Sequence, residues 1–206
     1  MTSHAAMKPD LIVVRHAHPE VMPEHLASAW PLSPGGWAAA RSLGKRLGAL
    51  GKLHVVSSPE VKAVQTGEAI RPGAMPATDE RFGEQGRGTV PFLSGGDFRE
   101  RVIAHFRHPD ERMLGEESSA EAAARFDAGA RDVLSAPGEN DGIPVIVSHG
   151  RIVSAWLATH AGTPSGTCEP AETIWTSLRM PDALLLRRSG AGWCWSRLSD
   201  DPGAGR

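Results

Sequence analysis

The sequence predicts an α/β fold: a three-layer α/β/α sandwich with a mostly parallel central sheet, antiparallel edge strands near the C-terminus and a lid-like insertion. Three short aliphatic runs, at residues 11–14, 53–56 and 143–147, are typical of strands buried on both faces. Apolar residues at helical spacing follow each run, and this alternation of strand and helix favours a parallel sheet covered by helices. From residue 172 onward, short β-prone pieces separated by turn residues predict the antiparallel strands.

The composition limits the class of protein. The chain has 206 residues, 40% hydrophobic content and a net charge of −2, so we expect a single domain over residues 1–206 and no nucleic-acid-binding surface. Residues 1–10 hold no apolar run of signal-peptide length, and no segment approaches a membrane span. Cys168 and Cys194 show neither a CxxC spacing nor a disulfide framework. These features together predict a soluble, cytoplasmic protein.

Two helices have recognisable start signals. Ser33 followed by Pro34 predicts an N-cap and a first turn, and the apolar spacing beyond them predicts a helix that ends near Gly51. Ser58 and Pro59 give the same signal for the helix after the second predicted strand.

A long segment at about residues 71–117 is rich in proline, glycine and charge. Connections of this length are uncommon unless they are functional, so we interpret it as an insertion that forms a lid over the strand ends. Apolar residues within 98–106 keep helical spacing and predict one helix in it. A further amphipathic helix follows the insertion, with Ser118 or Ser119 as its cap.

The C-terminal region predicts three short strands and a tail. The β-prone pieces are residues 173–178, 183–186 and 193–198, and glycine-containing turn residues separate the last two. Residues 200–206 are expected to be disordered.

Cationic and imidazole side chains follow the predicted strands at the points where the strands end. Arg15 and His16 follow the first strand, His149 follows the third, and Lys62 lies near the start of the helix after the second. Ligands of open α/β sheets bind at this edge. Two cations, two imidazoles and a helix N-terminus suit a phosphoryl group, whose oxygens need several charge-assisted donors. The two cations also disfavour protonation of His16, which would leave it neutral and nucleophilic.

Five motifs, in a fixed order between residues 11 and 160, give a more specific indication. They are Arg15-His16-Ala17, Leu32 to Gly36, Ser57 to Thr66, Glu117-Ser118 with Arg125, and Ser148-His149-Gly150. Together they resemble the signature of the histidine phosphatase superfamily, the fold shared by cofactor-dependent phosphoglycerate mutases and many phosphatases.

The resemblance implies a role for each candidate site residue. His16 would be the phosphorylated nucleophile, and His149 would act beside it as a catalytic residue. Arg15, Lys62 and His149 would bind the phosphoryl oxygens. Glu84 would give a proton to the leaving group, with Glu80 as a competitor for that role. The resemblance implies no metal ion and no cofactor.

The chain also departs from the family pattern. Ala17 stands where glycine is usual, and His18-Pro19 replaces an acidic residue and a threonine. Met22 stands where the family has an asparagine, and Lys62 stands where it has an arginine, which keeps the charge but loses the bidentate fork. These changes leave phosphohistidine chemistry in place and do not name the substrate.

The favoured interpretation is a phosphatase that acts on a small phosphomonoester, because the insertion is shorter than in the family's mutases. Mutase-type phosphoryl transfer and a non-catalytic phosphate-ligand binding protein on the same fold are the alternatives within the family. A metal-dependent hydrolase that uses the His16-Ala17-His18 pair is the alternative outside it, but such barrels need about 250 residues. The expected partner is a small phosphorylated metabolite, with no nucleic acid and no membrane, and a homodimer is left open.

Overall fold

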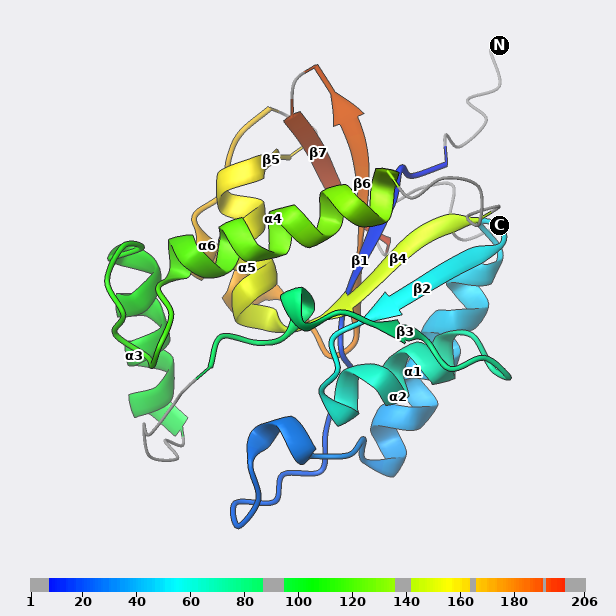
Figure 1. Ribbon diagram of the computed structural model, residues 1–206, viewed down its shortest axis with the longest axis horizontal. Helices are drawn as coiled ribbons and strands as arrows, with labels where there is room; N and C mark the ends of the chain where they lie inside the picture. The colour runs from blue at the N-terminus through cyan, green and yellow to red at the C-terminus, as the bar shows by residue number, and fades with distance from the viewer. Residues whose placement is uncertain (1–7, 87–94, 136–141, 164–165, 191, 199–206) are drawn as a thin grey trace.

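A computed structural model describes residues 8–86, 95–135, 142–163, 166–190 and 192–198 (Figure 1). Its centre is a seven-stranded sheet with the order β3-β2-β4-β1-β6-β7-β5. Helices cover both faces of this sheet, so the predicted three-layer α/β/α sandwich with a mostly parallel sheet and antiparallel C-terminal strands is confirmed. Among the described residues, every helix is too short or too polar to cross a membrane.

The three predicted aliphatic runs form the centre of the sheet. They are β1 (Leu11–Arg15), β2 (Leu53–Ser57) and β4 (Ile143–Ser148), and β4 pairs in parallel with both of the others. Successive residues of a strand point to opposite faces, and in β1 both faces are buried. Leu11 and Val13 join one hydrophobic cluster, while Ile12 and Val14 join the other. That double burial explains the continuous apolar sequence.

The C-terminal strands extend the sheet beyond β1. β6 (Asp182–Ser189) pairs antiparallel with β1, and β7 (Gly192–Arg197) pairs antiparallel with β6. Two-residue strands end the sheet on either side, β5 (Ala161–Gly162) beside β7 and β3 (Ala77–Thr78) beside β2.

The strand predicted at residues 173–178 is wrong. This segment is helix α6 (Ala171–Ser177), which begins after Pro170. Ala171, Ile174 and Leu178 are all buried, and their spacing of three and four residues is that of a helix. Tertiary packing of one helical face therefore outweighs the β-propensity of Thr173 to Thr176.

Two helices cover one face of the sheet. α1 (Pro34–Gly48) begins where the sequence predicted, because the Ser33 hydroxyl accepts a hydrogen bond from the Gly36 N–H at 3.0 Å. α2 (Val61–Ile70) begins later than predicted. Its N-cap residue is Glu60, and Ser58 instead accepts a hydrogen bond from the Glu60 N–H at 3.2 Å.

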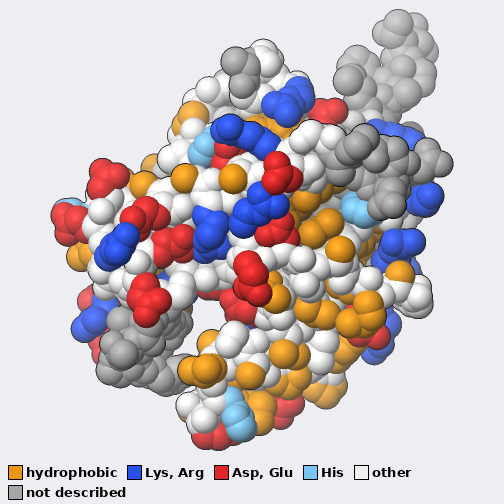
Figure 2. Space-filling model, in the orientation of Figure 1, with side chains coloured by type: hydrophobic (Ala, Val, Ile, Leu, Met, Phe, Trp, Pro, Cys, Tyr) orange, Lys and Arg blue, Asp and Glu red, His pale blue; other side chains and the backbone are white. Residues whose placement is uncertain are grey.

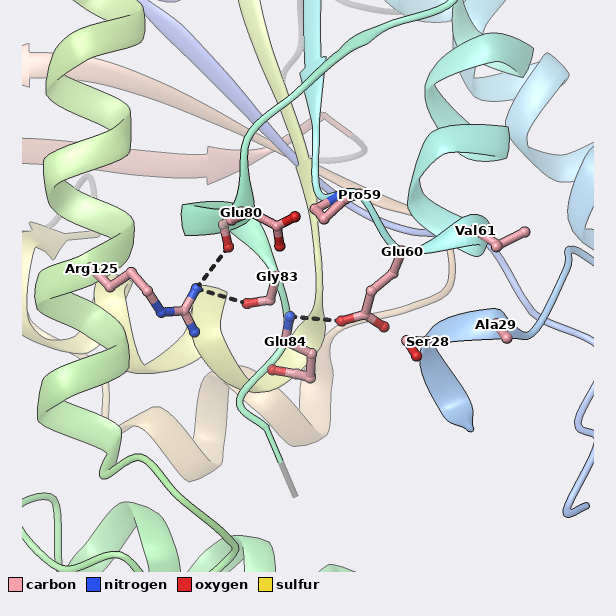
Figure 3. A pocket seen from close by; sticks show the side chains of 9 residues that line it. All are labelled: Ser28, Ala29, Pro59, Glu60, Val61, Glu80, Gly83, Glu84 and Arg125. Carbon is pink, nitrogen blue, oxygen red and sulfur yellow. Dashed lines mark hydrogen bonds between the residues drawn. The ribbon is translucent and has the colours of Figure 1, made fainter. Parts of the chain in front are cut away.

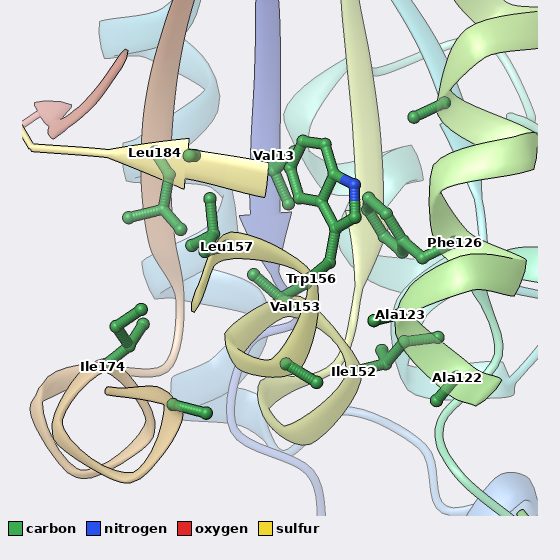
Figure 4. Close-up of a cluster of buried hydrophobic side chains, with 14 of the residues drawn as sticks. Val13, Ala122, Ala123, Phe126, Ile152, Val153, Trp156, Leu157, Ile174 and Leu184 are labelled. Atoms are coloured by element: carbon green, nitrogen blue, oxygen red, sulfur yellow. The ribbon is translucent and has the colours of Figure 1, made fainter. Parts of the chain in front are cut away.

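Helices α4 (Ser119–Ser135) and α5 (Gly150–His160) pack on the opposite face. Ser118 caps α4 in a capping box, because its hydroxyl accepts from the Glu121 N–H and the Glu121 carboxylate accepts from the Ser118 N–H. Figure 4 shows Trp156 of α5 between the sheet and α4, with its ring centroid 4.8 Å from that of Phe126. This packing fixes α5, and therefore the position of its N-terminus at the end of β4.

The segment at residues 71–117 contains β3, the 3₁₀ helix η2 (Glu80–Phe82) and α3 (Gly95–Arg107). The helix predicted within residues 98–106 is thus present, and it packs on α6 through aromatic contacts to Trp175. The predicted lid function stays a prediction. Residues 87–94, like the predicted disordered tail at 200–206, lie outside the described residues. The face drawn in Figure 2 carries interspersed acidic and basic side chains.

Candidate active site

The carboxyl ends of β1 and β4 bring the two predicted histidines together. Arg15 is in register with Ser148, and the His16 N–H donates to the Ser148 carbonyl at 2.9 Å. The rings of His16 and His149 then meet edge to face, with centroids 5.0 Å apart. Residues separated by 133 positions in the chain therefore form one site because their strands are parallel neighbours.

His16 is held as a neutral imidazole with one hydrogen-bonded ring nitrogen. Its side chain is buried, and Nδ1 lies 2.8 Å from the Ala17 carbonyl oxygen. A carbonyl only accepts, so Nδ1 carries the proton and Nε2 carries the free lone pair. Burial lowers the pKa of His16 well below its ordinary value, and His149, Lys62 and Arg15 lower it further. The ring is therefore uncharged at neutral pH.

His149 is fully buried and points at the start of α2. Its Nε2 lies 2.8 Å from the Ser58 hydroxyl and 3.3 Å from a Glu60 carboxylate oxygen. Burial lowers its pKa to about 3, even though the Glu84 carboxylate acts in the opposite direction. Both imidazoles are consequently neutral hydrogen-bonding groups at physiological pH.

Arg15 reaches across the sheet end to α5 and α6. Its Nη1 donates to the Leu178 carbonyl at 2.8 Å, and its buried Nε has no partner within the described residues. A Cβ at Gly150 would lie only 3.0 Å from that Nε, so glycine is needed for the guanidinium to pack against the start of α5. Burial lowers the pKa of Arg15, and Glu84 and Asp182 oppose that effect. A buried donor without a partner is available to an incoming anion.

Lys62 is buried on α2, and its ammonium is engaged by a carboxylate that the sequence analysis did not single out. Nζ donates to the Ala27 carbonyl at 2.7 Å and pairs with Glu60 at 2.5 Å. Glu60 stands directly after Pro59 and is the N-cap residue of α2, a position that the sequence analysis assigned to Ser58.

Glu84 is an acceptor of hydrogen bonds in this structure. Its two oxygens accept from the backbone N–H groups of Gln85, Arg151 and Ile152 at 3.1–3.2 Å. Burial alone would raise the pKa of Glu84, but Arg151, His149 and these N–H groups outweigh it and hold the pKa at about 2. The carboxylate thus caps the N-terminus of α5 and pairs with the Arg151 side chain at 3.5 Å. Arg151 is a second site residue that the sequence analysis missed.

The Glu117 and Arg125 motif holds the segment that carries Glu84. Arg125 pairs with Glu117 at 2.7 Å and donates to the carbonyls of Arg81 and Gly83 at 2.8 and 3.1 Å. The motif therefore positions the backbone between η2 and Glu84 rather than reaching the histidines.

The remaining motif residues tie neighbouring loops to α2. Gln65 accepts from the Leu32 N–H at 2.7 Å, and Thr66 accepts from the Ala17 N–H at 3.0 Å. Of the departures from the family pattern, Ala17 is fully buried, while the Met22 carbonyl accepts from the Trp30 indole at 2.7 Å.

An open cavity of about 500 Å³ lies beside the site (Figure 3), and Glu60, which lies 3.3 Å from Nε2 of His149, is one of its lining residues. Its lining residues are Ser28, Ala29, Pro59, Glu60, Val61, Glu80, Gly83, Glu84 and Arg125. Both candidate acids of the sequence analysis, Glu84 and Glu80, thus face the same cavity. No group of three or more His, Cys, Asp or Glu residues in the described part of the chain has the geometry of a metal site.

The carboxyl edge of this mostly parallel sheet thus carries two neutral histidines, two cations and a helix N-terminus. Groups of these kinds are donors suited to an anion. The model of the histidine phosphatase superfamily (branch 1) matches residues 11–180. The chain belongs to this superfamily, as its motifs predicted. A comparison with curated proteins gave no match.

Solved structures show the same fold. Mycobacterial glucosyl-3-phosphoglycerate phosphatase is 22% identical, with a TM-score of 0.62 over 91% of this chain and 95% of that chain. A phosphoserine phosphatase variant from Entamoeba histolytica, in complex with phosphoserine, is 16% identical, with a TM-score of 0.67 over 91% of this chain and 95% of that chain. Phosphoglycerate mutase from Bacillus anthracis is 14% identical, with a TM-score of 0.66 over 94% of each chain. At these identities the similarity establishes the fold alone.

Proposed function

We propose that the protein is a phosphatase that hydrolyses a small phosphomonoester through a phosphohistidine intermediate on His16. The observation that carries this proposal is the hydrogen bond from Nδ1 to the Ala17 carbonyl, which leaves Nε2 with a free lone pair in a buried, uncharged ring. Such a nitrogen attacks phosphorus without first losing a proton.

In the proposed reaction, Nε2 of His16 forms a bond to phosphorus as the bond to the ester oxygen breaks. Arg15, Lys62 and His149 donate to the phosphoryl oxygens, and the two cations offset the charge that a metal ion would otherwise neutralise. A water molecule then attacks phosphorus as the bond from phosphorus to Nε2 breaks, and one proton of the water passes to the carboxylate of Glu84. This step releases inorganic phosphate and restores the neutral imidazole. Hydrolysis by water, rather than transfer to a second hydroxyl, is what separates this proposal from mutase chemistry.

The proposed proton donor to the leaving oxygen is Glu84. It lines the cavity, and its charge acts on His149. In the ligand-free protein the carboxyl is ionised because its pKa is about 2. The role therefore requires Glu84 to gain a proton when a phosphoryl dianion binds, since a nearby like charge raises the pKa of a carboxyl group.

The proposed substrate is a small phosphorylated metabolite, in keeping with a cavity of about 500 Å³. The proposed location is the cytoplasm, because Cys168 and Cys194 are both free thiols.

A panel of phosphomonoesters, assayed with a chelator present, tests the proposal. His16→Ala is expected to abolish turnover while circular dichroism shows an unchanged fold. His18→Ala is the matched control, because His18 is an exposed neighbour. Within the described residues its Nδ1 bonds to the Pro19 carbonyl, at 2.8 Å, and to no other group. Turnover that survives in His16→Ala, or that is lost equally in both variants, would contradict the proposal.

A further inference from the structure

The carboxylate of Glu60 lies among the groups that the proposed function assigns to the phosphoryl oxygens. One oxygen is 2.5 Å from the Lys62 ammonium. The other accepts from the Glu84 N–H at 2.9 Å and lies 3.3 Å from Nε2 of His149. The Glu60 side chain is 15% exposed and, as Figure 3 shows, it extends from the start of α2 into the cavity. Glu60 therefore holds two of the three groups that we assign to phosphate binding.

A phosphoryl group that binds to Lys62 and His149 comes into contact with the Glu60 carboxylate, because that carboxylate lies beside both residues. A phosphomonoester has a second pKa of about 6, so it arrives mostly as a dianion at neutral pH. Two anions at hydrogen-bond distance repel each other in a partly buried site. A single proton removes the conflict, because it turns one of the two oxygens into a donor and creates a short, charge-assisted hydrogen bond.

We propose that Glu60 is part of the phosphoryl-binding site and that the bound complex holds one proton, taken up from solvent, between the Glu60 carboxylate and a phosphoryl oxygen. This inference rests on the proposed function. It makes Glu60 a residue that selects for anions able to share a proton, and it makes phosphate affinity fall as pH rises.

The other titratable groups that face this place do not supply the same proton. His16 and His149 have lowered pKa values, which keep both rings neutral. The oxygens of Glu84 already accept backbone N–H groups, with Arg151 beside them. The two remaining neighbours, Lys62 and Arg15, are cations whose charge attracts the phosphoryl group rather than a proton. Glu60 is thus the neighbouring acid whose carboxylate directly contacts two of the proposed phosphate-binding groups, Lys62 and His149.

Glu80 provides a matched control. It lines the same cavity from η2 and carries the same charge. Within the described residues, its carboxylate makes no hydrogen bond or ion pair with Lys62 or His149, in contrast to Glu60.

Titration calorimetry with inorganic phosphate tests the inference. Binding is measured between about pH 7.5 and 9, where phosphate is mostly dianionic, in two buffers of different ionisation enthalpy. We expect the wild type to take up about one proton more than Glu60→Gln when phosphate binds. We also expect the dissociation constant of the wild type to rise more steeply with pH, by about a further tenfold per pH unit, than that of Glu60→Gln. Glu80→Gln is expected to match the wild type.

The outcomes separate this inference from the proposed function. Binding of phosphate by the wild type without proton uptake would overturn the role of Glu60 and would show that phosphate alone does not protonate Glu84. It would leave the nucleophilic role of His16 intact, and this result does not depend on whether a variant folds. Unchanged proton uptake in Glu60→Gln would overturn it as well. A wild type that binds no phosphate at any pH would overturn both the proposed function and this inference.

Discussion

Glu84→Gln is expected to destabilise the protein in a pH-dependent way. The folded protein holds the pKa of Glu84 at about 2, compared with an ordinary value of 4.5. The difference between these values corresponds to about 3 kcal/mol, because each pKa unit is worth 1.36 kcal/mol. The side chain is only 19% exposed, so solvent screening removes little of this energy. A glutamine keeps one acceptor oxygen but turns an NH₂ group toward the backbone N–H donors of α5.

The sign follows from the depressed pKa. The stabilisation is fully present above the unfolded value of 4.5 and is lost as pH falls toward 2. Urea unfolding followed by tryptophan fluorescence, at pH 7 and near pH 3, measures it. We expect the variant to be less stable by about 3 kcal/mol at pH 7, and the difference to fall to less than half near pH 3. Glu80→Gln, at an exposed position, is expected to change stability little at either pH. A Glu84→Gln deficit below about 0.5 kcal/mol at pH 7, or one that is equal at both pH values, would refute the reasoning.

Three further changes test other parts of the account. Gly44→Ala should lower the free energy of unfolding in urea by about 1–3 kcal/mol, because its Cβ would lie 2.6 Å from a carbonyl oxygen of α2. Gly48→Ala in the same helix is the control: its Cβ would meet nothing within 4 Å, so the change should be neutral or stabilising. Equal effects of the two substitutions would contradict this. Lys62→Arg should keep or raise phosphatase activity, since it restores a bidentate fork with the same charge, and marked inactivation would remove Lys62 from the proposed phosphate site. Glu84→Gln should slow alkyl phosphates by about 10²–10⁴ but p-nitrophenyl phosphate much less, because a nitrophenolate leaves without a proton donor. If Glu80→Gln shows that selective loss instead, Glu80 is the acid.

The fold was predictable where local patterns and tertiary packing agree. The run at residues 11–14 is apolar throughout because both faces of β1 are buried, and Ser33-Pro34 starts a helix through a local hydrogen bond. The segment at 173–178 is different. Its threonines and tryptophan favour a strand by propensity, but only a helix buries both Ala171 and Ile174 against the core, and that packing determines the structure.

The site was predictable in its motif residues and not in their partners. His16 and His149 follow buried strands, so a parallel sheet brings them together. The ion pair of Glu84 with Arg151 joins positions 67 residues apart, and no local spacing encodes it. Glu60 was missed for another reason: the N-cap was expected two residues earlier, at Ser58. No local pattern indicates that the Glu60 carboxylate pairs with Lys62.

The central claim is that Nε2 of His16 is the nucleophile. Rapid acid-free quenching of the wild type with a ³²P-labelled phosphomonoester, followed by peptide mapping, tests it most directly. We predict a phosphoenzyme that is stable in base and labile in acid, as a phosphoramidate is, with the label on the peptide that contains His16 and no label in His16→Ala. A label on another residue, or steady turnover by the wild type with no phosphoenzyme at any quench time while His16→Ala remains active, would contradict the account.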